Sequence, residues 1–169
     1  MAVTTQNSTE YANTVATPPV MNQPTEDHGR MRIKYFKHTQ SGAGDAATSS
    51  VTLCKLPAGK VRMILALSRV YVNWTTSSAN IDLGWDAYTS GASGTEGDTI
   101  AADTDGLVDN LPVDSVGYFN FEGGLATTKA LGGTYVFESQ AGVIIRATSQ
   151  AAALADGDVI AGYIVYVVD

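Results

Sequence analysis

The chain has 169 residues, which is enough for one domain or for one domain with an arm, and 44% of them are hydrophobic, which suffices for a core. This composition excludes an intrinsically disordered protein. The formal net charge of −7 argues against nucleic acid as the main partner, because neutralising phosphates requires clustered Lys and Arg.

Residues 1–29 form a polar leader rich in Thr, Asn, Gln and Pro. Its apolar side chains are scattered, so it cannot bury enough surface to fold alone. Its prolines impose extended or polyproline geometry. We expect an extended arm that lies over a neighbouring subunit; an unstructured leader peptide is the alternative. The side chains expected to contact the partner are Tyr11, Val15, Pro18, Pro19, Val20, Pro24, Arg30 and Arg32.

Residues 30–169 show short β-patterned segments separated by Gly, Pro, Asp and Ser turns. The expected strands are Met31–Lys37, Thr48–Leu56, Val61–Trp74, Ile81–Asp86, Val113–Phe121, Thr134–Ser139, Val143–Thr148 and Val159–Val168. Val61–Trp74 is the longest apolar run, and a buried strand bent near Ser68-Arg69 competes there with an amphipathic helix. The spacing predicts an all-β domain of about eight strands, a β-sandwich or jelly roll.

Two segments in the middle of the chain are expected to lie outside the sheets. Tyr88–Asp98 has the Gly, Ser and Thr content of a loop. Thr104–Leu111 is expected to form one or two helical turns, with Thr104 as the cap and Pro112 after the end. This would be the domain's only helix.

The final strand, Val159–Val168, is apolar on both of its alternating faces. We therefore expect one face to be covered by the core and the other by another sheet or another subunit.

Charged residues are unevenly distributed along the chain. Most Lys and Arg lie in the first half, whereas Asp and Glu crowd residues 82–122. The separation predicts either two faces of opposite sign that complement a partner or another copy, or an ordinary solvated surface.

Cys54 is alone, so an internal disulfide and a Cys-based zinc site are excluded, and its Leu neighbours predict a buried thiol. There is no signal-like N-terminus and no run of about 20 apolar residues. We expect synthesis in the host cytoplasm and no membrane partner.

The sequence offers little chemistry, and we predict that the chain is not an enzyme and has no cofactor. Neither His28 nor His38 neighbours a nucleophile motif. A glycosidase needs a pair of carboxylates, and the candidates are Glu96, Glu122 and Glu138. Each is more easily explained as a solvated charge at a strand end or in a loop. A surface cation is weakly indicated by oxygen ligands close in sequence, but the EF-hand pattern fails. These candidates are Asp98, Asp103, Asp105 and Asp109.

Three short motifs resemble a group of tailed-bacteriophage virion proteins. They are the turn Leu56-Pro57-Ala58-Gly59, the strand Leu83-Gly84-Trp85 and the closing apolar strand Ala161–Val168. The resemblance implies a head decoration or cement protein, commonly a homotrimer, that clamps major capsid protein subunits on the outer surface of the virion. It implies no active-site residues.

Two alternatives stay open. One is another virion structural role, as a coat protein, a head-fibre base or a tail component. The other is a carbohydrate-binding β-sandwich module, for which Trp74 and Trp85 are the aromatic candidates.

Overall fold

The computed structural model describes Thr17 and residues 30–42, 49–76, 79–91, 96–113, 116–121, 133–150 and 152–168. These residues form eleven strands and no helix, which confirms the all-β prediction. Among them there is accordingly no helix with the length and apolarity of a membrane span. The expected arm, apart from Thr17, lies outside the described residues.

The strands form two main antiparallel sheets and a small hairpin. The five-stranded sheet has the order β1 (Arg32–Thr39), β11 (Val159–Val168), β3 (Gly59–Asn73) and β8 (Gly117–Asn120), and β9 (Thr134–Ser139) pairs with the other half of β3. The four-stranded sheet has the order β2 (Ser50–Leu56), β10 (Val143–Ser149), β4 (Asn80–Trp85) and β7 (Asp103–Pro112). The hairpin joins β5 (Tyr88–Thr89) to β6 (Thr99–Ile100).

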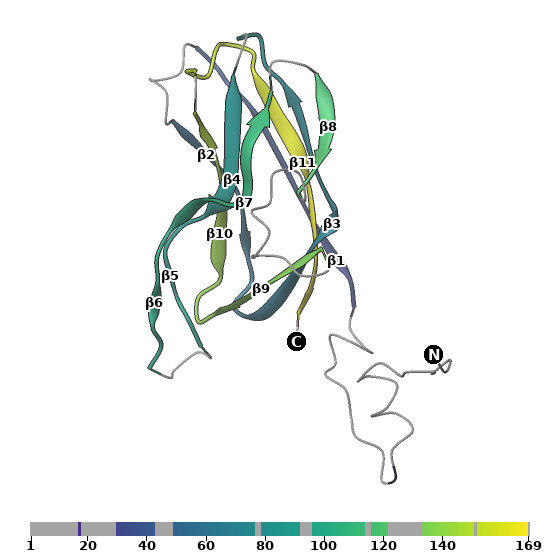
Figure 1. Ribbon diagram of the computed structural model, residues 1–169, viewed down its shortest axis with the longest axis vertical. Helices are drawn as coiled ribbons and strands as arrows, with labels where there is room; N and C mark the ends of the chain where they lie inside the picture. The colour runs from purple at the N-terminus through teal and green to yellow at the C-terminus, as the bar shows by residue number, and fades with distance from the viewer. Residues whose placement is uncertain are drawn as a thin grey trace, which may run out of the picture.

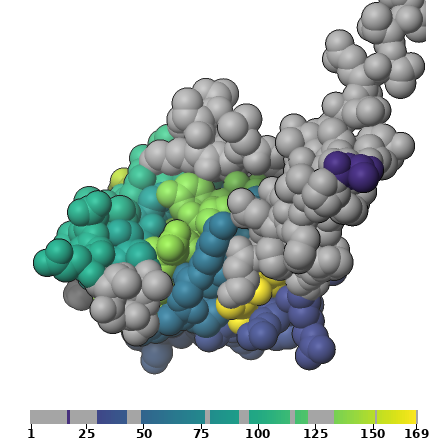
Figure 2. All heavy atoms as spheres, turned by 90° about the horizontal axis from the view of Figure 1, so that it is seen from below, coloured from purple at the N-terminus to yellow at the C-terminus, as the bar shows by residue number. Residues whose placement is uncertain are grey.

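The two main sheets pack face to face as a β-sandwich, and the hairpin projects from one end (Figure 1). Viewed from below, parts of β3, β11 and β1 lie in a row in blue, yellow and purple (Figure 2). The jelly-roll form of the sandwich remains a prediction.

One hydrophobic core fills the space between the sheets. Alternate side chains of β3, such as Val61, Met63 and Val72, point inward and are fully buried. Their partners from the opposite sheet include Leu83 and Ile145, which are also fully buried. The period of two in these strands thus places one apolar face of each sheet in the core.

The helix predicted at Thr104–Leu111 is wrong, because these residues belong to strand β7. β7 pairs with β4, with Val108 opposite Leu83 and Leu111 opposite Ile81. The capping signal is local, whereas burying Leu107, Val108 and Leu111 against the core requires the strand, so tertiary packing decides. Two register shifts interrupt the β4–β7 ladder and disturb the alternation that would have identified a strand.

All the predicted strands are observed, most of them with ends shifted by a few residues. Thr134–Ser139 and Val159–Val168 match β9 and β11, whereas Val113–Phe121 narrows to β8. Val61–Trp74 is strand and not helix. The expected loop Tyr88–Asp98 begins instead with strand β5, since Tyr88 pairs with Ile100.

A buried carboxylate fastens the loop before β11 to the end of β3. Asp158 is only 1% exposed, and its Oδ1 accepts hydrogen bonds from the Thr75 backbone N–H at 2.9 Å and the Thr75 hydroxyl at 3.1 Å. Its Oδ2 accepts the Ala155 backbone N–H at 2.8 Å. Asp158 thus supplies acceptors for donors of Thr75 and Ala155 at the edge of the core.

Candidate interaction surface

The outer face of the five-stranded sheet is apolar and exposed, which is unusual for a surface that meets water. Every large apolar side chain that the described residues leave exposed lies on this face or directly before one of its strands. The two that precede a strand are Met31, two residues before Ile33, and Val116, two residues before Tyr118. The most exposed are Tyr35 at 73% and Tyr118 at 72%. The full set is Met31, Ile33, Tyr35, Leu67, Val116, Tyr118 and Val136.

Strand register collects four tyrosines from four different strands on this face. Tyr35 on β1 lies opposite Tyr163 on β11, with ring centroids 5.9 Å apart in an edge-to-face arrangement. Tyr71 on β3 lies opposite Tyr118 on β8, with centroids 4.9 Å apart. Such cross-strand aromatic pairs stabilise the sheet and leave large ring surfaces available for contact.

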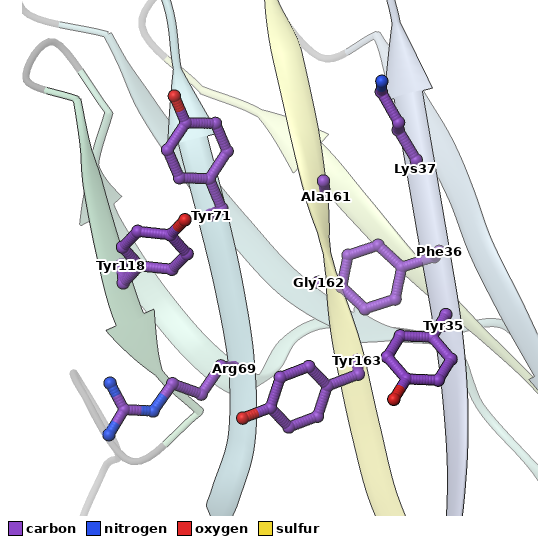
Figure 3. Close-up of a pocket in the computed structure, with 9 residues that line it drawn as sticks. All are labelled: Tyr35, Phe36, Lys37, Arg69, Tyr71, Tyr118, Ala161, Gly162 and Tyr163. Atoms are coloured by element: carbon purple, nitrogen blue, oxygen red, sulfur yellow. The ribbon is translucent and has the colours of Figure 1, made fainter.

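The two tyrosine pairs flank a hollow of about 570 Å³, called here the tyrosine groove. Ala161 lies between the pairs, Lys37 is at one end of the groove and Arg69 is at the other (Figure 3). Gly162 lies beside Ala161, where a Cβ would come within 2.1 Å of the Arg69 carbonyl oxygen. Glycine at position 162 therefore allows β11 and β3 to approach closely beneath the groove.

A second hollow on the same face, the aliphatic hollow, shares its Tyr35 and Tyr163 walls with the groove. Its remaining lining is Met31, Ile33, Leu67 and Val165. Leu67 is 50% exposed because β3 carries an irregularity there, where the β11–β3 register shifts.

Ser68 holds this irregularity in place. It is fully buried, its hydroxyl donates to the Ile64 carbonyl at 2.7 Å, and its Oγ accepts the Val165 backbone N–H at 3.0 Å. The bend expected near Ser68-Arg69 is thus a bulge, and the bulge turns Leu67 outward.

The two outer faces of the sandwich differ in charge. Outward positions of the five-stranded sheet include the cations Lys37, Arg62 and Arg69. Outward positions of the four-stranded sheet include Asp82 and the Asp86–Arg146 ion pair, together with Ile144. Three of the outward side chains on the apolar face are thus cations, and the separation into two faces of opposite sign stays a prediction.

Asp82 is a buried carboxylate at 5% exposure, and burial raises its pKa above the ordinary value of 3.8. Its oxygens accept hydrogen bonds from the Asn110 backbone N–H at 2.9 Å and from the Gln150 side chain. Asn110 has a positive φ of 53° at a shift of the β4–β7 register, so Asp82 stabilises this irregular turn of the backbone.

The residues predicted to contact a partner divide into two groups. Arg32 is exposed at the start of β1, and Arg30 is exposed two residues before it. Tyr11, Val15, Pro18, Pro19, Val20 and Pro24 lie outside the described residues.

The predicted chemical candidates do not converge in the described part of the chain. There, no three residues of the types His, Cys, Asp or Glu are grouped so as to hold a metal ion. Asp98 precedes β6, whereas Asp103, Asp105 and Asp109 are spread along β7. His38 pairs with Gln40 at 3.2 Å, and His28 and Glu122 lie outside the described residues.

Trp74 and Trp85 are core residues, with exposures of 5% and 4%. They therefore cannot serve as a sugar platform, which removes the residues on which the carbohydrate-binding alternative was based. The predicted buried thiol is confirmed, since Cys54 is 8% exposed and burial raises its pKa to about 11.

The tyrosine groove was not predicted as a site, although parts of its signal were present. The apolar second face of Val159–Val168 indicated a covered surface, and the structure places Ala161 and Tyr163 there, half-buried. On the same face Val165 and Val167 are buried.

Comparison with known proteins finds similarity only among solved structures. No protein-family model matches the chain. No curated protein matches it either.

Three similar structures come from viruses. A chain of the cyanophage Pam1 capsid asymmetric unit is 13% identical with a TM-score of 0.47, and the match covers 83% of this chain and 86% of that one. A chain of infectious bursal disease virus, Gx strain, is 13% identical with a TM-score of 0.43 over 82% of this chain. The VP2 subviral particle of infectious bursal disease virus gives 11% identity and a TM-score of 0.41.

The match spans about a third (33%) of either infectious bursal disease virus chain.

Proposed function

We propose that this protein is a structural subunit of a virion, which docks on neighbouring protein chains through the outer face of its five-stranded sheet. The observation that carries the proposal is that the exposed large apolar side chains of the described residues lie on that face or directly before two of its strands, β1 and β8. The sequence resemblance to tailed-phage virion proteins supplies the kind of assembly.

Burial of this face would supply the binding free energy. Fully burying one large apolar side chain is worth roughly 1.5–3 kcal/mol, and exposed tyrosines are typical of residues that dominate interfaces. The cations on the face would set orientation and favour an acidic partner surface.

In the finer form of the proposal, the protein decorates the outer surface of a phage head, where it binds major capsid protein and copies of itself, as a trimer. A subunit that binds only the assembled shell stabilises that shell by mass action. Where many linked copies bind one lattice, each bound copy raises the effective concentration of the next, so weak individual contacts give strong overall binding.

Quantitative mass spectrometry of purified particles whose genome carries this sequence tests the role. The proposal predicts a constant ratio of this chain to the major capsid protein across preparations, retained after washing in high salt. Absence of the chain from intact particles would refute a structural role. A ratio of only a few copies per particle would favour a tail or fibre-base position over decoration.

A further inference from the structure

We infer that the tyrosine groove binds the proline-rich segment Ala16–Asp27 from the arm of a neighbouring copy of this chain. The inference rests on the proposed function and deepens it, because it names the occupant of part of the docking face. It is argued from the shape and charge of the groove and from the composition of the segment.

The groove has the form of a site that binds proline-rich segments. Polyproline II segments dock between aromatic side chains, since their geometry is preformed and little entropy is lost on binding. The pairs Tyr35–Tyr163 and Tyr71–Tyr118 provide two aromatic walls with Ala161 between them. The segment contributes Pro18, Pro19 and Pro24.

The dimensions agree with this occupant. Four adjacent strands at roughly 4.8 Å spacing give a sheet about 14 Å wide between the outer strands. A polyproline II chain rises about 3.1 Å per residue, so about five residues cross those strands. The segment, twelve residues long in the sequence, is sufficient to cross the groove and continue beyond it.

The charges of the two surfaces are complementary. The proposed occupant, Ala16–Asp27, has the carboxylates Glu26 and Asp27 next to each other at one end and contains no Lys or Arg. The groove carries Lys37 and Arg69 at its two ends. A segment laid along the groove would place this acidic end beside one of the two exposed cations, Lys37 or Arg69.

The direction of β1 favours the arm of a second copy over the chain's own arm. β1 runs from Arg32 toward Lys37, so the groove lies further along the strand than its start. An arm that kept the direction of β1 would lead away from its own groove, which leaves the groove open to the arm of another copy.

Photo-crosslinking with isotope-mixed full-length protein tests this inference. The photoreactive residue p-benzoylphenylalanine replaces Tyr118 in the full chain. Equal amounts of ¹⁴N- and ¹⁵N-labelled protein are mixed, irradiated and mapped by mass spectrometry. In the matched control the same residue replaces Thr104, which is exposed on β7 of the other sheet.

The inference predicts mixed light–heavy products that join position 118 to residues 16–27. These products should be lost when Pro18, Pro19 and Pro24 are all replaced by Ala, and they should be absent from the position-104 control. Three results would overturn the inference: crosslinks that join only peptides of the same isotope, crosslinks from position 118 to another segment, or no crosslink at position 118. Constant incorporation into particles alongside any of these results would leave the proposed virion role intact.

Discussion

Removing the Asp158 carboxylate tests how the loop before β11 is held on the sandwich. The side chain is 1% exposed and accepts three hydrogen bonds, two from Thr75 and one from Ala155. A hydrogen bond to a charged group contributes about 1.5–3 kcal/mol, so three at the lower limit give roughly 4.5 kcal/mol.

The net loss should be smaller, because Thr75 is exposed and its donors can turn to water. We expect Asp158→Ala to lower the free energy of unfolding by about 3 kcal/mol. Asp156→Ala is the matched control. Asp156 is exposed and accepts one hydrogen bond, from the Gly42 N–H at 2.7 Å, so its loss should cost at most about 1 kcal/mol.

Urea unfolding followed by tryptophan fluorescence measures both variants, since Trp74 and Trp85 are buried and report on the core. Asp158→Asn provides an intermediate case if the Ala variant does not fold, because it keeps an acceptor and loses the charge. If Asp158→Ala and Asp156→Ala had equal stabilities, the assignment of Asp158 as the loop's anchor would be refuted.

Three further predictions concern single residues. Burial raises the pKa of Asp82 above 3.8, so the folded state binds the carboxyl proton more tightly than the unfolded chain does. The contribution of Asp82 to stability therefore falls as pH rises from below 3.8 through its pKa in the folded state. Asp82→Asn should therefore be more stable than the parent at pH 7, and the gap between their urea midpoints should narrow toward the ordinary carboxyl pKa; a gap independent of pH would contradict this. Cys54, with its pKa raised to about 11, should react with Ellman's reagent only as fast as the protein opens, and rapid labelling of the folded protein at pH 8 would show that the thiol is accessible. Gly84→Ala should destabilise by about 2 kcal/mol or more in urea unfolding, because its Cβ would lie 1.9 Å from the Asp103 carbonyl oxygen; an unchanged midpoint would show that β7 can move away.

Strand prediction succeeded where glycine turns mark the ends of a β-patterned segment. β9 lies between Gly132-Gly133 and Gln140-Ala141-Gly142, β11 follows Asp156-Gly157-Asp158, and both match their predicted bounds. β7 was misassigned because its register shifts and the φ of Asn110 break the alternation that marks a strand. Only the pairing of β7 with β4 makes Asp103–Pro112 a strand, and that pairing is not visible within the segment itself.

The candidate surface was harder to foresee than the fold. Tyr35, Tyr71, Tyr118 and Tyr163 are far apart in sequence and meet only through the registers of β1, β11, β3 and β8. Alternation shows which side chains share a face of one strand, but not which face the second sheet covers. Trp74 and Trp85 were the more conspicuous aromatics, and both are in the core.

Cysteine labelling in assembled particles tests most directly whether the outer face of the five-stranded sheet is covered by other chains. Tyr118→Cys places a thiol on that face, and Thr104→Cys places one on β7 of the other sheet, against a low background from the buried Cys54. The account predicts that a maleimide labels both thiols on the free protein, and that in particles position 118 is protected while position 104 still reacts. Equal labelling of the two positions in particles would contradict it.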